Sequence, residues 1–474
     1  MRRAVDALEI DKPISSLTRF VALALTLVGI KFWFSLLLPL DWGHDTARGL
    51  ILCGALLGLI ILRLRPRPAP EIELYAKSPV WVRILLILAV AADLGIASQT
   101  TQRSVQTHRI PMDQGQATWR AARLLWQGED PYGTGAVLDD TTFVARFAAR
   151  KDLGMAPAVS RAALYASLLR YDKTLDPALR RQILPVPEES QLSEAAAREA
   201  RLLGYKYGPV LVVLTAPFAL FGLPAVVVML NSVVCFGLFA VMWRLLRGFT
   251  GAFAALGMVA LLLDRFIIWN YLENTATDVW ALLFCALAVH AYVARRPMAT
   301  AAALALAVGT KIFPSLTLLP LLLHFRSARP VALFAGLATA IYLPWLLWDP
   351  AGLVHNLLLW PLLMKDDTSW LYYVDPPVVW AVRIIALLAA AALWMRLLSG
   401  REPRLFWTLA MVNVLLLLTG GVFHNNYVPW ASIWVVAAII EAFTLGHNTD
   451  SRSDDASEQQ GASAAGIGPI LTRR

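Results

Sequence analysis

The stretch PMDQGQATWRAARLLWQGEDPY, residues 111–132, decides how the rest of the chain is interpreted, because it opens a long polar insertion between apolar segments. A carboxylate, Asp113, stands just before a run with helical character, residues 119–126. This run places aromatic, aliphatic and basic side chains on adjoining helix faces, as in a helix that lies flat in a membrane interface. Gly128 and Pro131 predict where the helix ends. We interpret this helix as the floor of a functional cleft that contains Asp113.

The composition indicates a polytopic membrane protein. The chain has 474 residues, of which 58% are hydrophobic and 16% charged, and several windows of about 17 or more residues carry almost no charge. The net charge of +9 would suggest nucleic-acid binding in a soluble domain. In an apolar chain it is better interpreted as topogenic charge on cytoplasmic loops. The cysteines at 53, 235 and 285 all lie in apolar segments, so we expect no disulfide in the external loop.

Window and charge criteria predict an all-α bundle of about twelve membrane spans with both termini cytoplasmic. The expected apolar segments are residues 20–40, 49–62, 84–97, 225–243, 251–263, 279–293, 300–309, 313–323, 331–348, 378–395, 405–418 and 428–443. The segments at 300–309 and 313–323 are hinged at Lys311. The first span has no cleavage site after it and is expected to be retained.

The predicted organisation has three parts. Residues 1–83 form a cytoplasmic N-terminal tail, two spans and a linker; residues 84–445 form the main membrane domain; residues 446–474 form a disordered cytoplasmic tail. In the main domain, residues 98–224 form a long external loop that carries interfacial helices. Its last segment, 205–224, is apolar but contains Pro209 and Pro217, so we interpret it as half-buried rather than spanning. Residues 264–278 and 349–377 are predicted to be further external loops.

The ionisable residues of this arrangement collect on the external side, where charged groups beside an apolar bundle are candidate functional groups. They are Asp113, Asp130, Arg265, Glu273, Asp278, Lys311, His355, Lys365, Asp366, Asp367, Arg383 and His424. No nucleotide-binding fingerprint, HExxH motif or zinc-ligand spacing is present, so we expect no metal and no cofactor. An activated substrate on this side would have to arrive on a lipid carrier.

Five weak motifs follow one another in a fixed order: an aspartate after an early span, a helix ending in G-x-DPY, Y-x-Y-x-P, K-x-x-P and H-x-N-Y. The residues that carry them are Asp113, Ala121, Ala122, Leu125, Gly128, Asp130, Pro131, Tyr132, Tyr205, Tyr207, Pro209, Lys311, Pro314, His424, Asn426 and Tyr427. With this order and topology, roughly residues 84–443 resemble the GT-C class of integral-membrane glycosyltransferases. The closest resemblance is to glycosyltransferase family 87, the polyprenyl-phosphate-mannose-dependent mannosyltransferase type.

The chain departs from that family pattern at both ends of the motif series. It has two additional N-terminal spans and an unusually long first external loop. It also has Gly208-Pro209 and Gly421-Val422 where the family usually has Pro-Pro or Ser-Pro. These departures leave the identity of the molecule that would receive the sugar less certain by resemblance than the type of reaction.

The resemblance implies an inverting glycosyltransferase of cell-envelope biosynthesis at the external face of the plasma (inner) membrane. It would move a sugar from a polyprenyl-phosphate donor to a hydroxyl of a lipid or glycan acceptor. The family resemblance implies mannose as that sugar; arabinose, glucose and other sugars remain open. Asp113 would be the general base. The donor phosphate would contact residues of the later motifs and spans, namely Arg383, Lys311, His424, Tyr132 and Tyr207. The expected partners are the donor, the acceptor and membrane lipids, and not nucleic acid.

Other interpretations remain open from the sequence. A secondary transporter commonly has about twelve spans, but it usually shows two related halves and buried charges near the middle of the membrane. A polymerase or ligase of lipid-linked glycans is a further alternative. Among single residues, Asp113 could cap its helix, Lys311 and Arg383 could extend to the interface, and His424 could bind a loop carbonyl.

Overall fold

The computed structural model describes residues 80–108, 110–111, 113–132, 205–249, 251–359, 361, 375–400, 404–420 and 427–445. Helices are the regular secondary structure of these ranges. The first two predicted spans, most of the predicted external loop 98–224 and the C-terminal tail lie outside them.

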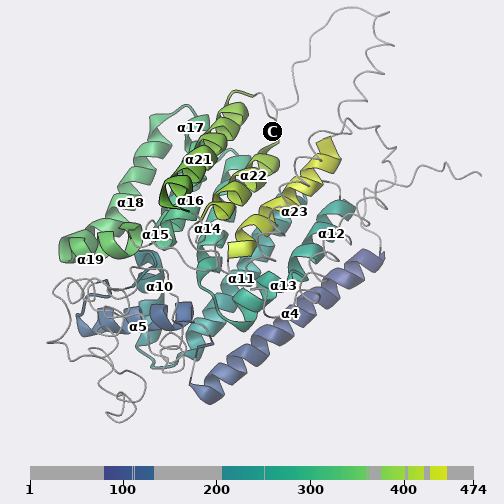
Figure 1. Ribbon diagram of the computed structural model, residues 1–474. Coiled ribbons are helices and arrows are strands. Elements are labelled where there is room, and N and C mark those ends of the chain that lie inside the picture. Colours follow the sequence, from purple (N-terminus) through teal and green to yellow (C-terminus); the bar gives the residue numbers. More distant parts are fainter. Residues whose placement is uncertain are drawn as a thin grey trace, which may run out of the picture.

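Apolar helices form a bundle, and the short helix α5 lies across one end of it (Figure 1). The elements are α4 (Val80–Thr107), α5 (Asp113–Gln127), α10 (Pro209–Ala219), α11 (Ala225–Leu246), α12 (Gly251–Leu262), α13 (Arg265–Ile267), the π-helix η3 (Ile268–Glu273), α14 (Asp278–Val293), α15 (Pro297–Thr310), α16 (Ile312–Leu316), α17 (Pro320–His324), α18 (Ala328–Trp348), α19 (Pro350–Val354), the π-helix η4 (His355–Leu359), α21 (Pro376–Leu398), α22 (Leu405–Leu418) and α23 (Val428–Leu445).

Four of these helices, α4, α11, α18 and α21, are long and apolar enough to cross a membrane. A fifth candidate is the pair formed by α12 and α13–η3, which is bent by 43° at a short break. The chain is thus an all-α protein with four to five candidate membrane spans over its described residues. The predicted fold class is confirmed to that extent. The predicted count of about twelve is not, because α14, α15, α22 and α23 are apolar but short for a full span, and the first two predicted spans lie outside the described residues. The segment predicted to be half-buried rather than spanning contains α10, which is also short.

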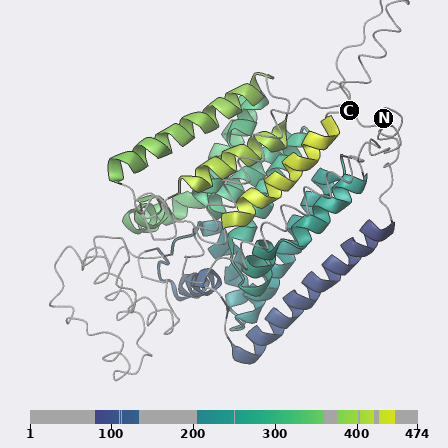
Figure 2. The same ribbon diagram turned by 45° about the vertical axis from the view of Figure 1, so that its right-hand side comes forward.

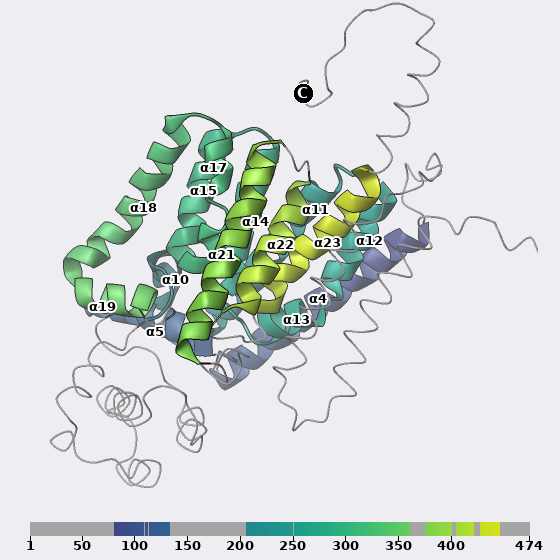
Figure 3. The same ribbon diagram turned by 45° about the horizontal axis from the view of Figure 1, so that its top comes forward.

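Burial separates a central layer of the bundle from a peripheral one. The most apolar window of α11 is 61% buried, whereas the corresponding windows of α4 and α21 are 22% buried and that of α18 only 6%. Figure 2 shows α4 as a long helix along one side of the bundle, and Figure 3 shows α18 at the opposite margin. Exposed apolar side chains on the outer helices, such as Leu347 and Leu388, are what a lipid-facing surface requires.

The two predicted external loops are partly helical, which corrects the sequence-based assignment. Asp264 accepts a hydrogen bond from the backbone N–H of Phe266 at 2.8 Å, and α13 and η3 follow it. Asp349 accepts one from Gly352 N–H at 2.9 Å and begins α19 with Pro350 at the first helical position. Both are ordinary helix-start signals, because a carboxylate before a helix satisfies a free backbone N–H. Most of the remainder of the second loop, residues 362–374, lies outside the described ranges.

A close backbone contact joins the start of α10 to the end of α15. The N–H of Gly208 donates to the carbonyl of Thr310 at 2.8 Å. A Cβ at Gly208 would lie 2.0 Å from the carbonyl oxygen of Gly309. The backbone of Gly208, at φ −69° and ψ 159°, is one that any residue adopts, so the glycine is required by the close approach alone.

Replacing Gly208 with alanine should therefore destabilise the bundle. Because backbone atoms form the obstacle, we expect a loss of about 2 kcal/mol or more, measured as a lower melting temperature of the purified protein in detergent. Gly336→Ala in α18 is the matched control, since a Cβ there meets nothing within 4 Å. Equal melting temperatures for Gly208→Ala and Gly336→Ala would show that the close approach does not require glycine at position 208.

Candidate functional site

One face of α5 is buried against the end of the bundle. Ala117 and Ala121 belong to a buried cluster with Tyr132, Tyr205 and Trp345. On the adjoining face, Trp119 and Ala122 pack against residues of α10 and α11. The predicted helix at 119–126 is thus present and longer than expected. Trp119 is a core residue here and does not belong to an exposed interfacial belt.

The first turn of α5 lies directly against the turn that precedes α14. A Cβ at Gly115 would lie 3.2 Å from the carbonyl oxygen of Thr275, a residue with a left-handed φ of +62°. The side-chain amide of Gln114 donates to Asp278 Oδ2 over a long 3.4 Å. Asp113 is the first residue of α5, so its backbone is held beside the start of α14. Its side chain, the predicted base, lies outside the described part of the structure.

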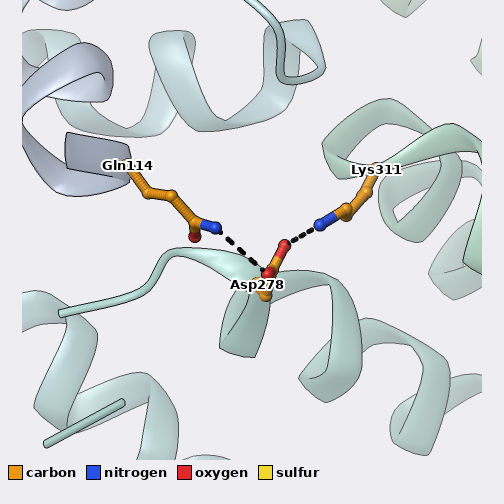
Figure 4. Close-up of polar contacts among 3 residues, drawn as sticks. All are labelled: Gln114, Asp278 and Lys311. Carbon is orange, nitrogen blue, oxygen red and sulfur yellow. Dashed lines mark hydrogen bonds and ion pairs between the residues drawn. The ribbon is translucent and has the colours of Figure 1, made fainter. Parts of the chain in front are cut away.

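Asp278 and Lys311 form an ion pair in the interior of the site (Figure 4). Asp278 is the first residue of α14, and its side chain is fully buried. Lys311 stands in the break between α15 and α16, and 15% of its side chain is exposed. Its ammonium group lies over the ring of Tyr427 at 4.3 Å and over that of Tyr207 at 5.8 Å. Aromatic faces attract a cation, so these rings add to the stabilisation of the ammonium group.

Three tyrosines connect the insertion to the bundle. The hydroxyl of Tyr132 donates to the carbonyl of Tyr207 at 2.9 Å, and the N–H of Tyr205 donates to the carbonyl of Pro131 at 2.9 Å. These bonds join the two ends of the stretch that begins after Tyr132. Burial raises the pKa of the Tyr132 and Tyr205 hydroxyls well above the usual tyrosine range. Both therefore remain neutral and able to donate at any physiological pH.

The segment after α18 closes the same end of the bundle. The side chain of Asn356 in η4 donates to the carbonyl of Tyr132 at 3.0 Å. Figures 1 and 3 accordingly show α19 beside α5. Distant parts of the chain thus meet here: α5 with Tyr132, the Tyr205–Gly208 segment, the start of α14, the α15–α16 break, η4 and Tyr427 before α23.

Arg383 lies in the second turn of α21, as its position in the sequence suggested. Its Nε donates to the carbonyl of Thr419 at the end of α22, at 3.3 Å, and its guanidinium lies 5.2 Å from the centre of the Trp380 ring. Thr419 is eight residues before Tyr427, the residue under Lys311. Glu441, near the end of α23, accepts from the N–H of Phe406 at the start of α22, so the other ends of these two helices, with Thr419 and Tyr427, lie together. Arg383 and Lys311 therefore belong to the same end of the bundle.

The structure thus brings some predicted site residues together and leaves others apart or outside. Lys311 and Tyr207 are in contact. Tyr132 is fully buried, and its hydroxyl donates to the backbone carbonyl of Tyr207. Arg383 binds the carbonyl of Thr419 at the end of α22, and His424 lies outside the described residues.

Sequence reasoning did not single out Asp278, although it counted this residue among the external ionisable groups. The available signal was its position at the first residue of an apolar helix, where a carboxylate is costly unless it is paired. Among the described residues, no three His, Cys, Asp or Glu side chains gather as a metal site would need. Asp366 and Asp367, the adjacent acids of the second loop, lie outside those residues.

The ion pair should be detectable in the stability of single and double variants. Lys311→Met leaves the buried Asp278 carboxylate without its cation, which should cost on the order of 3 kcal/mol. Adding Asp278→Asn removes the unpaired charge and should restore much of the lost melting temperature. If the melting temperature of the double variant falls by the sum of the decreases in the two single variants, the two side chains do not interact.

No family model matches the chain. A search among curated proteins finds no match either. The function of this site is therefore argued from its residues and from the motifs they form.

Proposed function

We propose that the chain is a membrane glycosyltransferase that moves a sugar, mannose by its sequence resemblance, from a polyprenyl-phosphate donor to a hydroxyl of a lipid or glycan acceptor. One observation carries the proposal. The motif segments at α5, Tyr205–Gly208, Lys311 and Tyr427 are far apart in the sequence but meet at one end of an apolar bundle. A lipid-linked substrate needs such a place, where a polar site adjoins a lipid-facing surface.

The arrangement of basic residues supports placing this end on the external side. Arg295 and Arg296 follow the far end of α14, and Arg396 lies in the last turn of α21. These arginines are at the opposite ends of helices whose first residues are near the site. An excess of arginine marks cytoplasmic loops, so the site would face outward and the protein would reside in the plasma (inner) membrane.

The proposed reaction is a single displacement. The carboxylate of Asp113 takes the proton of the acceptor hydroxyl while that oxygen attacks the anomeric carbon of the donor sugar. The bond between the anomeric carbon and the phosphate oxygen breaks, and its electron pair leaves with the phosphate. The configuration inverts. The polyprenyl phosphate departs as a stable anion, so it needs positive charge nearby and no acid to protonate it.

The contacts of the two described cations suggest different roles in that reaction. Lys311 is already paired with Asp278, which neutralises most of its attraction for another anion. Arg383 is half-buried, and an arginine guanidinium presents its N–H donors in a planar fork that matches a phosphate. Arg383 is therefore the stronger candidate for the donor phosphate. Lys311, Tyr207 and His424 remain further candidates, and Tyr132 would hold Tyr207 in place.

The proposal is tested by sugar transfer from a panel of radiolabelled polyprenyl-phosphate sugars, in membranes that contain the intact chain or Asp113→Asn. We expect transfer by the intact chain and a loss of 100-fold or more in the variant, the usual contribution of a general base. Glu129→Gln removes an exposed acid at the other end of α5 and should leave transfer unchanged.

Equal transfer by the intact chain and Asp113→Asn would remove Asp113 from the mechanism. Absence of transfer from every donor, combined with uptake of a labelled solute into vesicles, would instead favour the transporter interpretation.

A second prediction concerns the donor phosphate. Arg383→Gln should raise the KM for the donor about tenfold, as expected for the loss of a charged hydrogen bond, with a smaller change in kcat. Arg396→Gln, at the opposite end of the same helix, should leave the donor KM unchanged. Identical donor KM values for the two variants would exclude Arg383 as the phosphate contact.

A further inference from the structure

The side chain of Asp278 touches both halves of the site. One carboxylate oxygen pairs with Lys311, and the other accepts from Gln114, the residue directly after the proposed base (Figure 4). We infer that Asp278 is a positioning residue for the transfer reaction, which holds the first turn of α5 and Lys311 in fixed places relative to each other. This inference rests on the function proposed above.

Two further contacts hold the first turn of α5 against the bundle. The hydrogen bond to Asp278 adds a third. The backbone at Gly115 lies close to Thr275, where an added Cβ would be 3.2 Å from the carbonyl oxygen, tighter than an ordinary van der Waals contact. The hydroxyl of Thr118 donates to the carbonyl of Gln114 at 2.8 Å, and the Tyr205 hydroxyl lies 3.0 Å from Thr118. Thr118 has used its only proton, so Tyr205 is the donor in that pair. The residue next to the proposed base is thus held by both its carbonyl and its side chain.

Stability alone does not account for the ion pair. Removing two charges from water is costly, and a buried pair is often no more stable than apolar side chains of the same volume. The Asp278–Lys311 pair lies at one end of the contact between α14 and α15, two helices that otherwise pack through buried alanine, leucine and valine side chains. A role in orienting the polar residues around it explains its presence better.

The pair also sets the charge that surrounds the proposed base. The groups facing Asp278 are Lys311 and the buried tyrosines Tyr205 and Tyr271, and Tyr427 faces Lys311. Lys311 supplies the positive charge among these described neighbours and Asp278 the negative one. Without Asp278, the ammonium group would be unbalanced beside the first turn of α5, and a positive charge there favours the ionised form of a carboxylate carried by that turn. The pKa of the base would then fall. In a plot of kcat against pH, the decrease of kcat on the acid side would therefore move to lower pH.

Asp278→Asn tests the inference because it keeps the size of the side chain and one acceptor but removes the charge. We expect kcat to fall about tenfold, with the donor KM changed by less than threefold and the acid limb moved to lower pH. Gln114→Met removes the link to α5 without changing any charge. It should lower kcat by a smaller factor and leave the acid limb in place. In the double variant, kcat should fall by less than the product of the two single-variant factors, because both substitutions break the same attachment of α5.

Glu441→Gln is the matched control for replacing a buried acid with its amide. Glu441 accepts from the backbone N–H groups of Phe406 and Trp407 at the start of α22, away from the site. We expect this variant to lower the melting temperature and to leave kcat and the pH profile of the folded protein unchanged. Should Asp278→Asn fail to fold, Gln114→Met still tests the attachment.

Hydrogen exchange separates this inference from the proposed function, because it needs no substrate. In nanodiscs, the amides of α5 should exchange faster in Asp278→Asn and Gln114→Met than in the intact protein, and at an unchanged rate in Glu441→Gln. If the intact chain transfers no sugar, the proposed function fails and the exchange result still decides the attachment. If transfer occurs but kcat, the acid limb and the exchange of α5 are the same in the intact protein and both variants, the inference is overturned.

Discussion

A buried carboxylate in an apolar helix bundle must be paired, and the pairing of Asp278 with Lys311 is the constraint on which the site depends. Lys311 reaches Asp278 because the chain is extended at this residue, between α15 and α16. Backbone groups at such a break need partners away from water. The carbonyl of Thr310 finds one in the N–H of Gly208, which joins the segment that returns at Tyr205 to the bundle.

The same contacts explain why polar residues from distant parts of the chain meet at one end. The stretch after Tyr132 returns at Tyr205, and hydrogen bonds between these two ends place Tyr207 beside Lys311. The first turn of α5 is fixed against the start of α14. An acid-bearing helix, a cation and aromatic rings are thereby assembled next to lipid-facing helices, which suits chemistry on a lipid-linked substrate.

Much of the helical arrangement could be predicted from the sequence, because apolar windows and charged ends are local signals. The segment at 225–243 and the hinge at Lys311 lie where α11 and the α15–α16 break are found. The short helices after Asp264 and Asp349 were missed because a capping carboxylate before a few apolar residues also fits a loop. The roles of Asp278 and Tyr132 could not be predicted, since each depends on a partner that only the folded chain brings near.

The most direct test of the account is the structure of the protein in a nanodisc with a bound polyprenyl-phosphate sugar, determined by electron cryomicroscopy. The account predicts the donor phosphate within hydrogen-bond distance of the Arg383 guanidinium, and the anomeric carbon on the side of Asp113. It also predicts that the Asp278–Lys311 pair remains closed beneath the sugar. A phosphate bound near Arg396 and Arg404, at the opposite end of the bundle, would contradict it.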